Sequence, residues 1–289
     1  MRSLLLLVIL VPVVVLSQGR KIKTIKTSTP VIRATVDRAG DFYVTLKTGE
    51  IQKYDKQGKF INSFIHKGIP TVFDPTNAMK LLVYYHDSGE YAWLSPSLEL
   101  SAFQKIDPAL AIEPILICPS GERDLWILDA ADFSLRKVNQ FAGFIKIDPI
   151  TGKQKSNDPG KTDHGQLDAS VTNEFIVTLD MIPSANAVTS MREYQNVLFL
   201  FDQKHGIALY NNLGKLIRSI EVSNLKDFNF LGEELYFMSE GKIKFLDMFT
   251  GEKHELALTG NVDFALLTDE RMVLVKNDQI DVYEFQPVK

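Results

Sequence analysis

Residues 42–60 read FYVTLKTGEIQKYDKQGKF. The stretch opens on the apolar run Phe42-Tyr43-Val44-Thr45-Leu46, turns at Gly49, and runs through a second segment to Tyr54. A second turn, containing Gly58, leads into another strand-like segment that begins at Phe60. β-Branched and aromatic residues separated by short glycine turns are typical of antiparallel strands. The stretch therefore predicts three successive strands of one antiparallel sheet.

The same arrangement recurs along the chain. Each further apolar run is followed by a turn and a second strand, and these runs occupy residues 81–85, 125–128, 197–201, 235–238 and 272–275. The intervals between equivalent positions are 40, 44, 72, 36 and 37 residues, taken between Tyr54, Leu94, Val138, Tyr210, Leu246 and Tyr283. A period of about 40 residues with four short strands per unit is typical of a β-propeller blade. We therefore predict an all-β chain folded as a β-propeller.

The longest interval, from Val138 to Tyr210, leaves the number of blades open. It fits either one blade with a long insertion or two blades of which one is degenerate. Residues 148–170, DPITGKQKSNDPGKTDHGQLDAS, are rich in Gly, Pro, Asp and Lys and poor in apolar side chains. This composition is typical of an exposed excursion. We favour six blades over seven.

The two ends of the chain predict how the ring closes. The last repeat stops near Phe285, soon after its third strand, and lacks an outer strand. Residues 22–27, IKTIKT, alternate as an edge strand does and precede the first repeat, which begins near Val31. We expect this N-terminal strand to complete the last blade.

The first residues have the layout of a signal peptide. Arg2 precedes an apolar run from Leu4 to Leu16, and Ser17 offers a cleavage site before Gln18. The run is shorter than the roughly 20 residues that a membrane-spanning helix needs, although an uncleaved anchor is the alternative. No cysteine stands directly after the run, so we expect no site for bacterial lipid attachment. We expect residues 1–17 to be a leader and 18–289 a single exported domain, periplasmic or at the outer face of the outer membrane.

Composition excludes several classes of function. The chain has 32 basic and 36 acidic residues and a formal charge of −4, which gives no basic surface for nucleic acid. Its one cysteine, Cys118, lies in an apolar strand-like run and excludes an internal disulfide and a thiolate-rich zinc site. We expect Cys118 to be a buried small hydrophobe and not a nucleophile. We expect no cofactor.

The repeat also carries a family resemblance. Residues 37–44, DRAGDFYV, followed by residues 49–60, GEIQKYDKQGKF, resemble the blade pattern of NHL-like and related six-bladed propellers of the TolB-like group. In that pattern an Asp-x-x-Gly turn precedes a strand that opens on an aromatic residue, and a Tyr-Asp-x-x-Gly-Lys turn follows. The resemblance implies the six-bladed fold. It leaves function open, because that group contains lactonases, lyases, sensors and scaffolds.

The resemblance also implies one catalytic alternative. Gluconolactonase-type propellers place Glu, Asn and Asp ligands for a divalent cation at the mouth of the central channel. Glu113, Asp227 and Asp263 are the matching candidates here, because they stand near the starts of predicted inner strands. A metal-dependent, lactonase-like hydrolase is therefore the first alternative function, and a carbohydrate- or peptide-binding sensor is the second.

The function we expect is non-catalytic binding of another protein. Catalytic motifs such as Gly-x-Ser-x-Gly and His-Glu-x-x-His are missing from the sequence, whereas propellers present loops in fixed positions on their faces. We expect a subunit of a bacterial cell-envelope complex whose partner is another envelope protein. The candidate contact residues come from the insertion, from residues 180–194, which read as a loop, and from a Phe-x-x-Phe segment: Phe141, Phe144, Asp163, His164, Met181, Ile182 and Met191. The apolar residues of 180–194 either form this contact or pack under a neighbouring blade.

Overall fold

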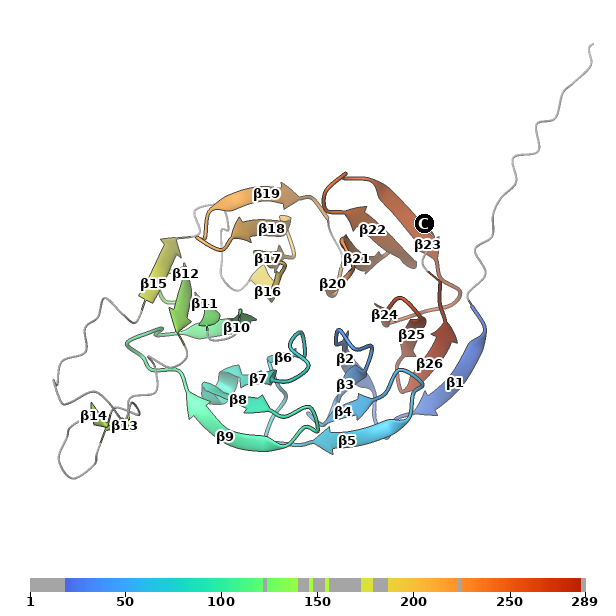
Figure 1. The fold of residues 1–289 in the computed structure, drawn as a ribbon, viewed down its shortest axis with the longest axis horizontal. Coiled ribbons are helices and arrows are strands. Elements are labelled where there is room, and N and C mark those ends of the chain that lie inside the picture. The colour runs from blue at the N-terminus through green and yellow to red at the C-terminus, as the bar shows by residue number, and fades with distance from the viewer. Residues whose placement is uncertain are drawn as a thin grey trace, which may run out of the picture.

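The computed structural model describes residues 19–121, 124–139, 146–147, 154–155, 173–178, 187–222 and 225–286. Six four-stranded antiparallel sheets stand around a common centre (Figure 1). The chain is thus a six-bladed β-propeller, as its repeats predicted.

Each blade runs from an inner strand near the centre to an outer strand at the rim. The first three blades are β2 (Val31–Val36), β3 (Phe42–Leu46), β4 (Ile51–Tyr54) and β5 (Phe60–Phe64); β6 (Val72–Asp74), β7 (Leu81–Tyr85), β8 (Glu90–Leu94) and β9 (Leu100–Lys105); and β10 (Pro114–Ser120), β11 (Asp124–Asp129), β12 (Ser134–Asn139) and β15 (Asn173–Thr178). A 3-10 turn, η1 (His86–Ser88), joins β7 to β8.

The remaining blades repeat the pattern. They are β16 (Val188–Tyr194), β17 (Val197–Asp202), β18 (Gly206–Asn211) and β19 (Leu216–Ile220); β20 (Phe228–Leu231), β21 (Glu234–Ser239), β22 (Lys242–Asp247) and β23 (Lys253–Ala257); and β24 (Phe264–Leu267), β25 (Arg271–Lys276), β26 (Gln279–Glu284) and β1 (Lys21–Lys26). A separate two-stranded sheet pairs β13 (Lys146–Ile147) with β14 (Gln154–Lys155).

The longest interval of the repeat belongs to one blade. Strand β12 pairs with β15, and residues 140–172 separate the two strands in sequence. The third blade is therefore closed by an outer strand that follows a long excursion, in agreement with the prediction of six blades. Within that excursion the structure describes only β13 and β14, so the expected exposure of residues 148–170 stays a prediction.

The N-terminal strand closes the ring. Strand β1 pairs antiparallel with β26, with Thr24 opposite Asp281 and Ile25 opposite Ile280. The last blade is thus built from both ends of the described chain, as predicted (Figure 1).

The core is divided among the six interfaces between neighbouring blades. Each of six hydrophobic clusters draws its buried residues from two adjacent blades. The second strand of a blade faces a cluster on either side, so β3 and β7 are buried along their whole length. This two-sided burial explains why the second strands read as unbroken apolar runs and not as alternating ones. Cys118 is fully buried in the cluster between blades 3 and 4, as expected.

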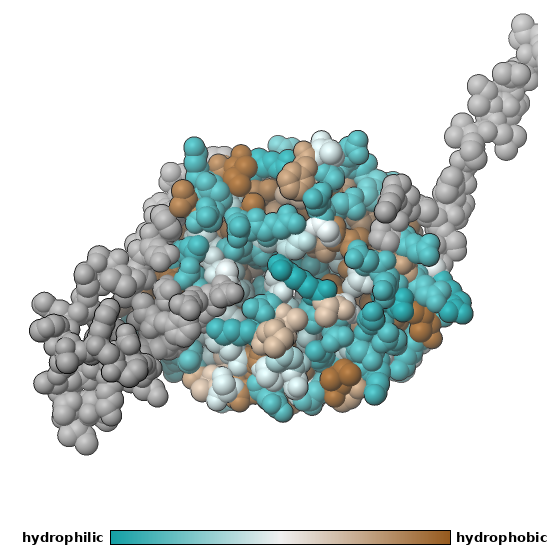
Figure 2. All heavy atoms as spheres, in the orientation of Figure 1, coloured by the Kyte–Doolittle hydropathy of each residue, from teal (hydrophilic) through white to brown (hydrophobic). Residues whose placement is uncertain are grey.

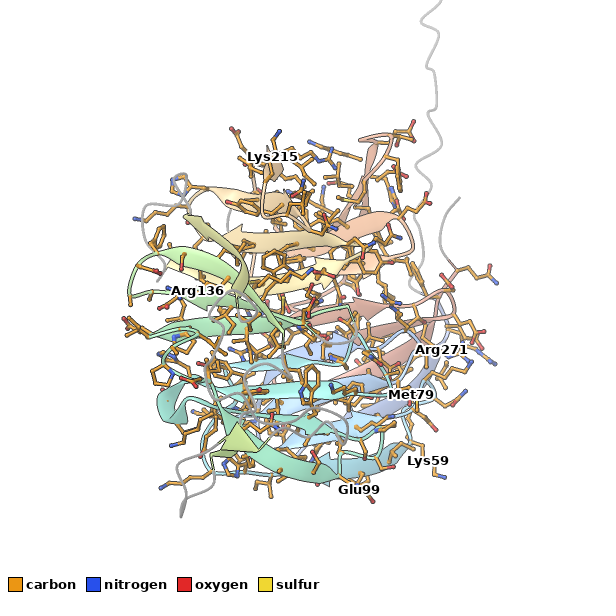
Figure 3. All side chains as sticks on the ribbon, turned by 60° about the vertical axis from the view of Figure 1, so that its left-hand side comes forward. Lys59, Met79, Glu99, Arg136, Lys215 and Arg271 are labelled. Carbon is orange, nitrogen blue, oxygen red and sulfur yellow. The ribbon has the colours of Figure 1, made fainter. Side chains whose placement is uncertain are left out.

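The disc has two different faces. One face carries the turns from first to second strands and from third to fourth strands; Lys59, Met79 and Arg271 lie on this side in Figure 3. We call it the turn face. The other, here the connection face, carries the turns from second to third strands and the links from each outer strand to the next inner strand. The described residues contain no helix with the length and apolar character that crossing a membrane requires.

Candidate functional site

Six of the seven predicted contact residues lie outside the described residues, namely Phe141, Phe144, Asp163, His164, Met181 and Ile182. The seventh, Met191, lies in β16 with 5% of its surface exposed, in the cluster between blades 3 and 4. Its prediction as a surface contact is therefore wrong, and the alternative of packing against a neighbouring blade holds for it. Residues 188–194 are an inner strand and not a loop. Their weak alternation follows from packing on both faces of that strand.

The three acidic residues expected at the channel mouth have separate surroundings. Asp227 accepts hydrogen bonds from Ser190 Oγ at 3.1 Å and from the Phe228 amide at 2.9 Å. Asp263 pairs with Lys226 Nζ at 2.9 Å, while Glu113 is exposed. In the part of the chain that the structure describes, no three His, Cys, Asp or Glu side chains are grouped as metal ligands would be.

The thiol of Cys118 has no catalytic surroundings. Burial raises the pKa of this thiol well above its ordinary value, and nearby Asp74 and Glu193 raise it further. Because the thiolate is the reactive form, Cys118 is a packing residue.

A different surface stands out on the connection face. Ile65 and Ile69, in the link from β5 to β6, are 68% and 49% exposed. Ile112, in the link from β9 to β10, is 72% exposed. We call Ile65, Ile69 and Ile112 the isoleucine patch. Sequence reasoning missed them, because an isolated isoleucine between strands has no signal that separates an exposed position from a buried one.

His86 joins the two links that carry the isoleucine patch. Its backbone amide donates to Thr71 Oγ1 at 3.0 Å, at the end of the first link. Its ring Nδ1 lies 3.0 Å from the carbonyl oxygen of Pro114, at the end of the second link. The two links therefore both contact the η1 turn of blade 2.

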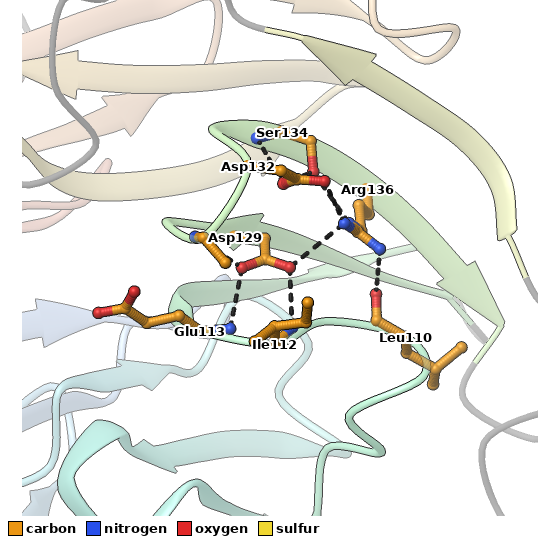
Figure 4. Close-up of polar contacts among 8 residues, drawn as sticks. Leu110, Ile112, Glu113, Asp129, Asp132, Ser134 and Arg136 are labelled. Atoms are coloured by element: carbon orange, nitrogen blue, oxygen red, sulfur yellow. Dashed lines mark hydrogen bonds and ion pairs between the residues drawn. The ribbon is translucent and has the colours of Figure 1, made fainter.

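The link that carries Ile112 is held by a polar network beneath it (Figure 4). The fully buried carboxylate of Asp129 accepts hydrogen bonds from the backbone amides of Ile112 and Glu113, each at 2.9 Å. Arg136 donates from Nη1 to the carbonyl of Leu110 at 3.0 Å, and its Nη2 lies 3.3 Å from Asp129. A second carboxylate, Asp132, also pairs with Arg136. The backbone beneath Ile112 is thus fixed before any partner arrives.

The link that carries Ile65 and Ile69 is fixed as well. Arg33 Nη1 donates to the carbonyl of Pro70 at 2.6 Å and also to that of Thr71. The Thr71 amide donates to the Tyr84 carbonyl at 2.7 Å. Beside Ile65, the ring of His66 packs on Phe103 with centroids 4.0 Å apart.

Gly49 lets this link lie close to blade 1. A side chain at Gly49 would meet the Gly68 carbonyl oxygen at 2.1 Å, so the close approach requires glycine.

The face of the disc that Figure 2 shows is mostly hydrophilic, and its hydrophobic residues occur mainly as separate spots toward the rim. Exposed apolar residues on the turns between third and fourth strands include Leu213 and Phe249, at 56% and 73% exposure. Scattered apolar residues are normal on a protein surface. The isoleucine patch differs in that its two links are fixed by hydrogen bonds and both contact His86.

Comparison with solved structures shows the fold. The Pan2 WD40 domain of Neurospora crassa aligns with a TM-score of 0.56 at 7% identity, over 94% of this chain and 96% of that one. Selenomethionine-substituted virginiamycin B lyase from Staphylococcus aureus aligns with a TM-score of 0.53 at 13% identity, over 91% and 98%. The computationally designed protein Ika8 aligns with a TM-score of 0.52 at 12% identity, over 92% and 100%.

These three proteins differ in kind but share the propeller architecture with this chain. At identities this low the likeness shows the fold alone. No protein-family model matches the sequence. No curated protein matches it either.

Proposed function

We propose that this chain is a non-catalytic protein–protein interaction module that docks another protein on its isoleucine patch. The observation that carries the proposal is that Ile65, Ile69 and Ile112 are exposed on two links whose backbones are fixed by Arg33, Asp129 and Arg136.

Fixed apolar side chains are efficient anchors. Burying one isoleucine in a partner stabilises a complex by about 1.5–3 kcal/mol. A flexible loop would lose part of that gain, because ordering an interface costs conformational entropy. A rigid backbone beneath Ile112 avoids most of this cost.

The proposed partner is a protein of the bacterial cell envelope, within a complex associated with the outer membrane. The support for this finer assignment is the leader-like sequence Arg2 to Ser17, which implies export. The proposal involves no cofactor and no nucleic acid.

Crosslinked pull-down from envelope fractions tests the proposal. The bait proteins are the parent chain, the double variant Ile65→Glu/Ile112→Glu, and the matched control Leu213→Glu/Phe249→Glu on the turn face. We expect the parent and the control to recover the same defined partner. The patch variant should recover at least tenfold less, since a loss of about 1.4 kcal/mol in binding free energy is a factor of ten in affinity.

All four substituted positions are exposed, so we expect the three proteins to have equal melting temperatures. Equal melting temperatures would show that the comparison reports binding and not folding. Equal recovery by the patch variant and the control would place the contact elsewhere. Recovery of background proteins alone by the parent, in repeated preparations, would remove the interaction hypothesis itself.

A further inference from the structure

A cavity of about 190 Å³ opens between the fifth and sixth blades. Its walls come from the start of β20, from the turn 239–241 and from the link 260–263. It reaches Ala34 of β2 in the first blade, so it opens beside the centre of the ring. The isoleucine patch lies on blades 1 to 3, and the two sites are separate.

The size of the cavity limits what it can hold. A protein cavity of about 150 Å³ accommodates benzene. A volume of about 190 Å³ therefore suits a single six-membered ring with small substituents. A peptide segment or a nucleotide would extend well beyond it.

Two carboxylates provide fixed hydrogen-bond acceptors at the cavity. Asp227 is held by Ser190 Oγ and the Phe228 amide, and Asp263 by Lys226 Nζ and the Asn277 amide. A carboxylate offers about four lone-pair sites, so each of these groups keeps acceptor capacity. The Asn277 amide and Lys226 hold the pKa of Asp263 below its usual value, and this carboxylate is ionised at neutral pH.

Each carboxylate of the cavity lining has a cation beside it, and the third one, Glu240, pairs with Lys244 Nζ at 2.7 Å. Arg192 Nη2 lies 3.8 Å from Asp227, and Lys226 lies 2.9 Å from Asp263. A cationic ligand would meet Lys226, which lines the cavity, as a like charge, and Arg192 already lies beside Asp227. Neutral hydroxyl donors fit the remaining lone pairs without that repulsion.

Apolar side chains form part of the cavity wall. Met238, Val262 and Phe264 line the cavity and are partly exposed. The Phe264 ring has two flat faces, and Lys226 Nζ lies over one of them, 5.5 Å from the ring centroid. Carboxylates that accept hydrogen bonds from hydroxyl groups, together with apolar side chains, match a sugar ring, which has hydroxyl groups at its edge and apolar C–H faces.

We propose that this cavity binds one monosaccharide unit, with hydroxyl groups donating to Asp227 and Asp263 and a C–H face against Phe264. The site makes the propeller a carbohydrate-binding protein as well as a protein-docking one. It does not depend on the isoleucine patch.

Titrations of the full chain by thermal shift and ligand-observed NMR test the proposal. The probes are D-glucose and N-acetyl-D-glucosamine, with ethanolamine as the cationic comparison. We expect saturable binding of at least one sugar, with an affinity that changes little between low and high salt, because a neutral ligand is not screened. Absence of saturable sugar binding would overturn the proposal. Binding of ethanolamine in place of both sugars, weakened by salt, would overturn the ligand class.

Two variants locate the site. Asn261→Trp puts a large side chain at an exposed position in the lining, and Asn212→Trp is its control on the turn face. We expect sugar binding to fall at least tenfold in the first and to stay unchanged in the second. Asp263→Asn, which keeps an oxygen for the Asn277 amide, should also weaken binding about tenfold. Unchanged sugar binding in Asn261→Trp would exclude this cavity.

Discussion

Arg136 shows how one buried side chain supports an exposed one. It pairs with the fully buried Asp129, which in turn holds the amides of Ile112 and Glu113. Removing one partner of a buried ion pair leaves the other charge uncompensated and typically costs about 3–5 kcal/mol. We therefore expect Arg136→Leu to lower the free energy of unfolding by about this amount, measured by urea denaturation at neutral pH.

Lys215→Leu is the control for that measurement, because Lys215 is an exposed turn residue (Figure 3). We expect a change within about 0.5 kcal/mol for this surface substitution. Equal unfolding midpoints for the two variants would show that the network around Asp129 contributes nothing to stability.

At the scale of the element, strand β1 depends on a carboxylate of its partner strand. Burial alone would raise the pKa of Asp281, but hydrogen bonds from Thr24, Lys21 and Gln279 outweigh it and leave that pKa below its ordinary value of 3.8. A group with a lowered folded-state pKa contributes stability above the unfolded-state pKa and loses it as the pH falls through the folded value. The pairing of β1 with β26 should therefore contribute less to stability from about pH 5 downward.

Unfolding free energies between pH 7 and pH 2.5 measure this dependence. Asp281→Asn keeps an acceptor oxygen for Thr24 but does not titrate. We expect its stability at pH 7 to be lower and its decline in acid to be shallower than that of the parent. Parallel pH profiles of the two proteins would contradict the assignment to Asp281.

The elements also show what the sequence could predict. The second strands, such as Leu81–Tyr85, were recognisable because clusters on both faces require a continuous apolar run. The closing strand was recognisable because the last repeat lacked a partner for Gln279–Glu284. Strand β16 was misread as part of a loop because its residues pack between two blades and do not alternate.

The candidate sites were much less predictable. The backbone at Ile112 is held by Asp129, which pairs with Arg136, and these two residues stand 17 and 24 positions later in the chain. The cavity joins Ala34 to Asp227 and Leu266, residues that only the closed ring brings together. No local sequence pattern carries that information.

At the scale of the molecule, stability should depend on closure of the ring. Without β1, the last blade would expose the edge of β26, and five registered residue pairs would be lost. At about 1 kcal/mol per net hydrogen bond, deletion of residues 19–26 should cost about 3–5 kcal/mol. Hydrogen exchange should then accelerate both in β26 and in β2, because one hydrophobic cluster joins the first and last blades. Lys26→Ala, which removes only an exposed ion pair with Asp278, is the control and should leave both strands protected. Faster exchange confined to β26 would show that the blades open singly and that the ring does not unfold as one unit.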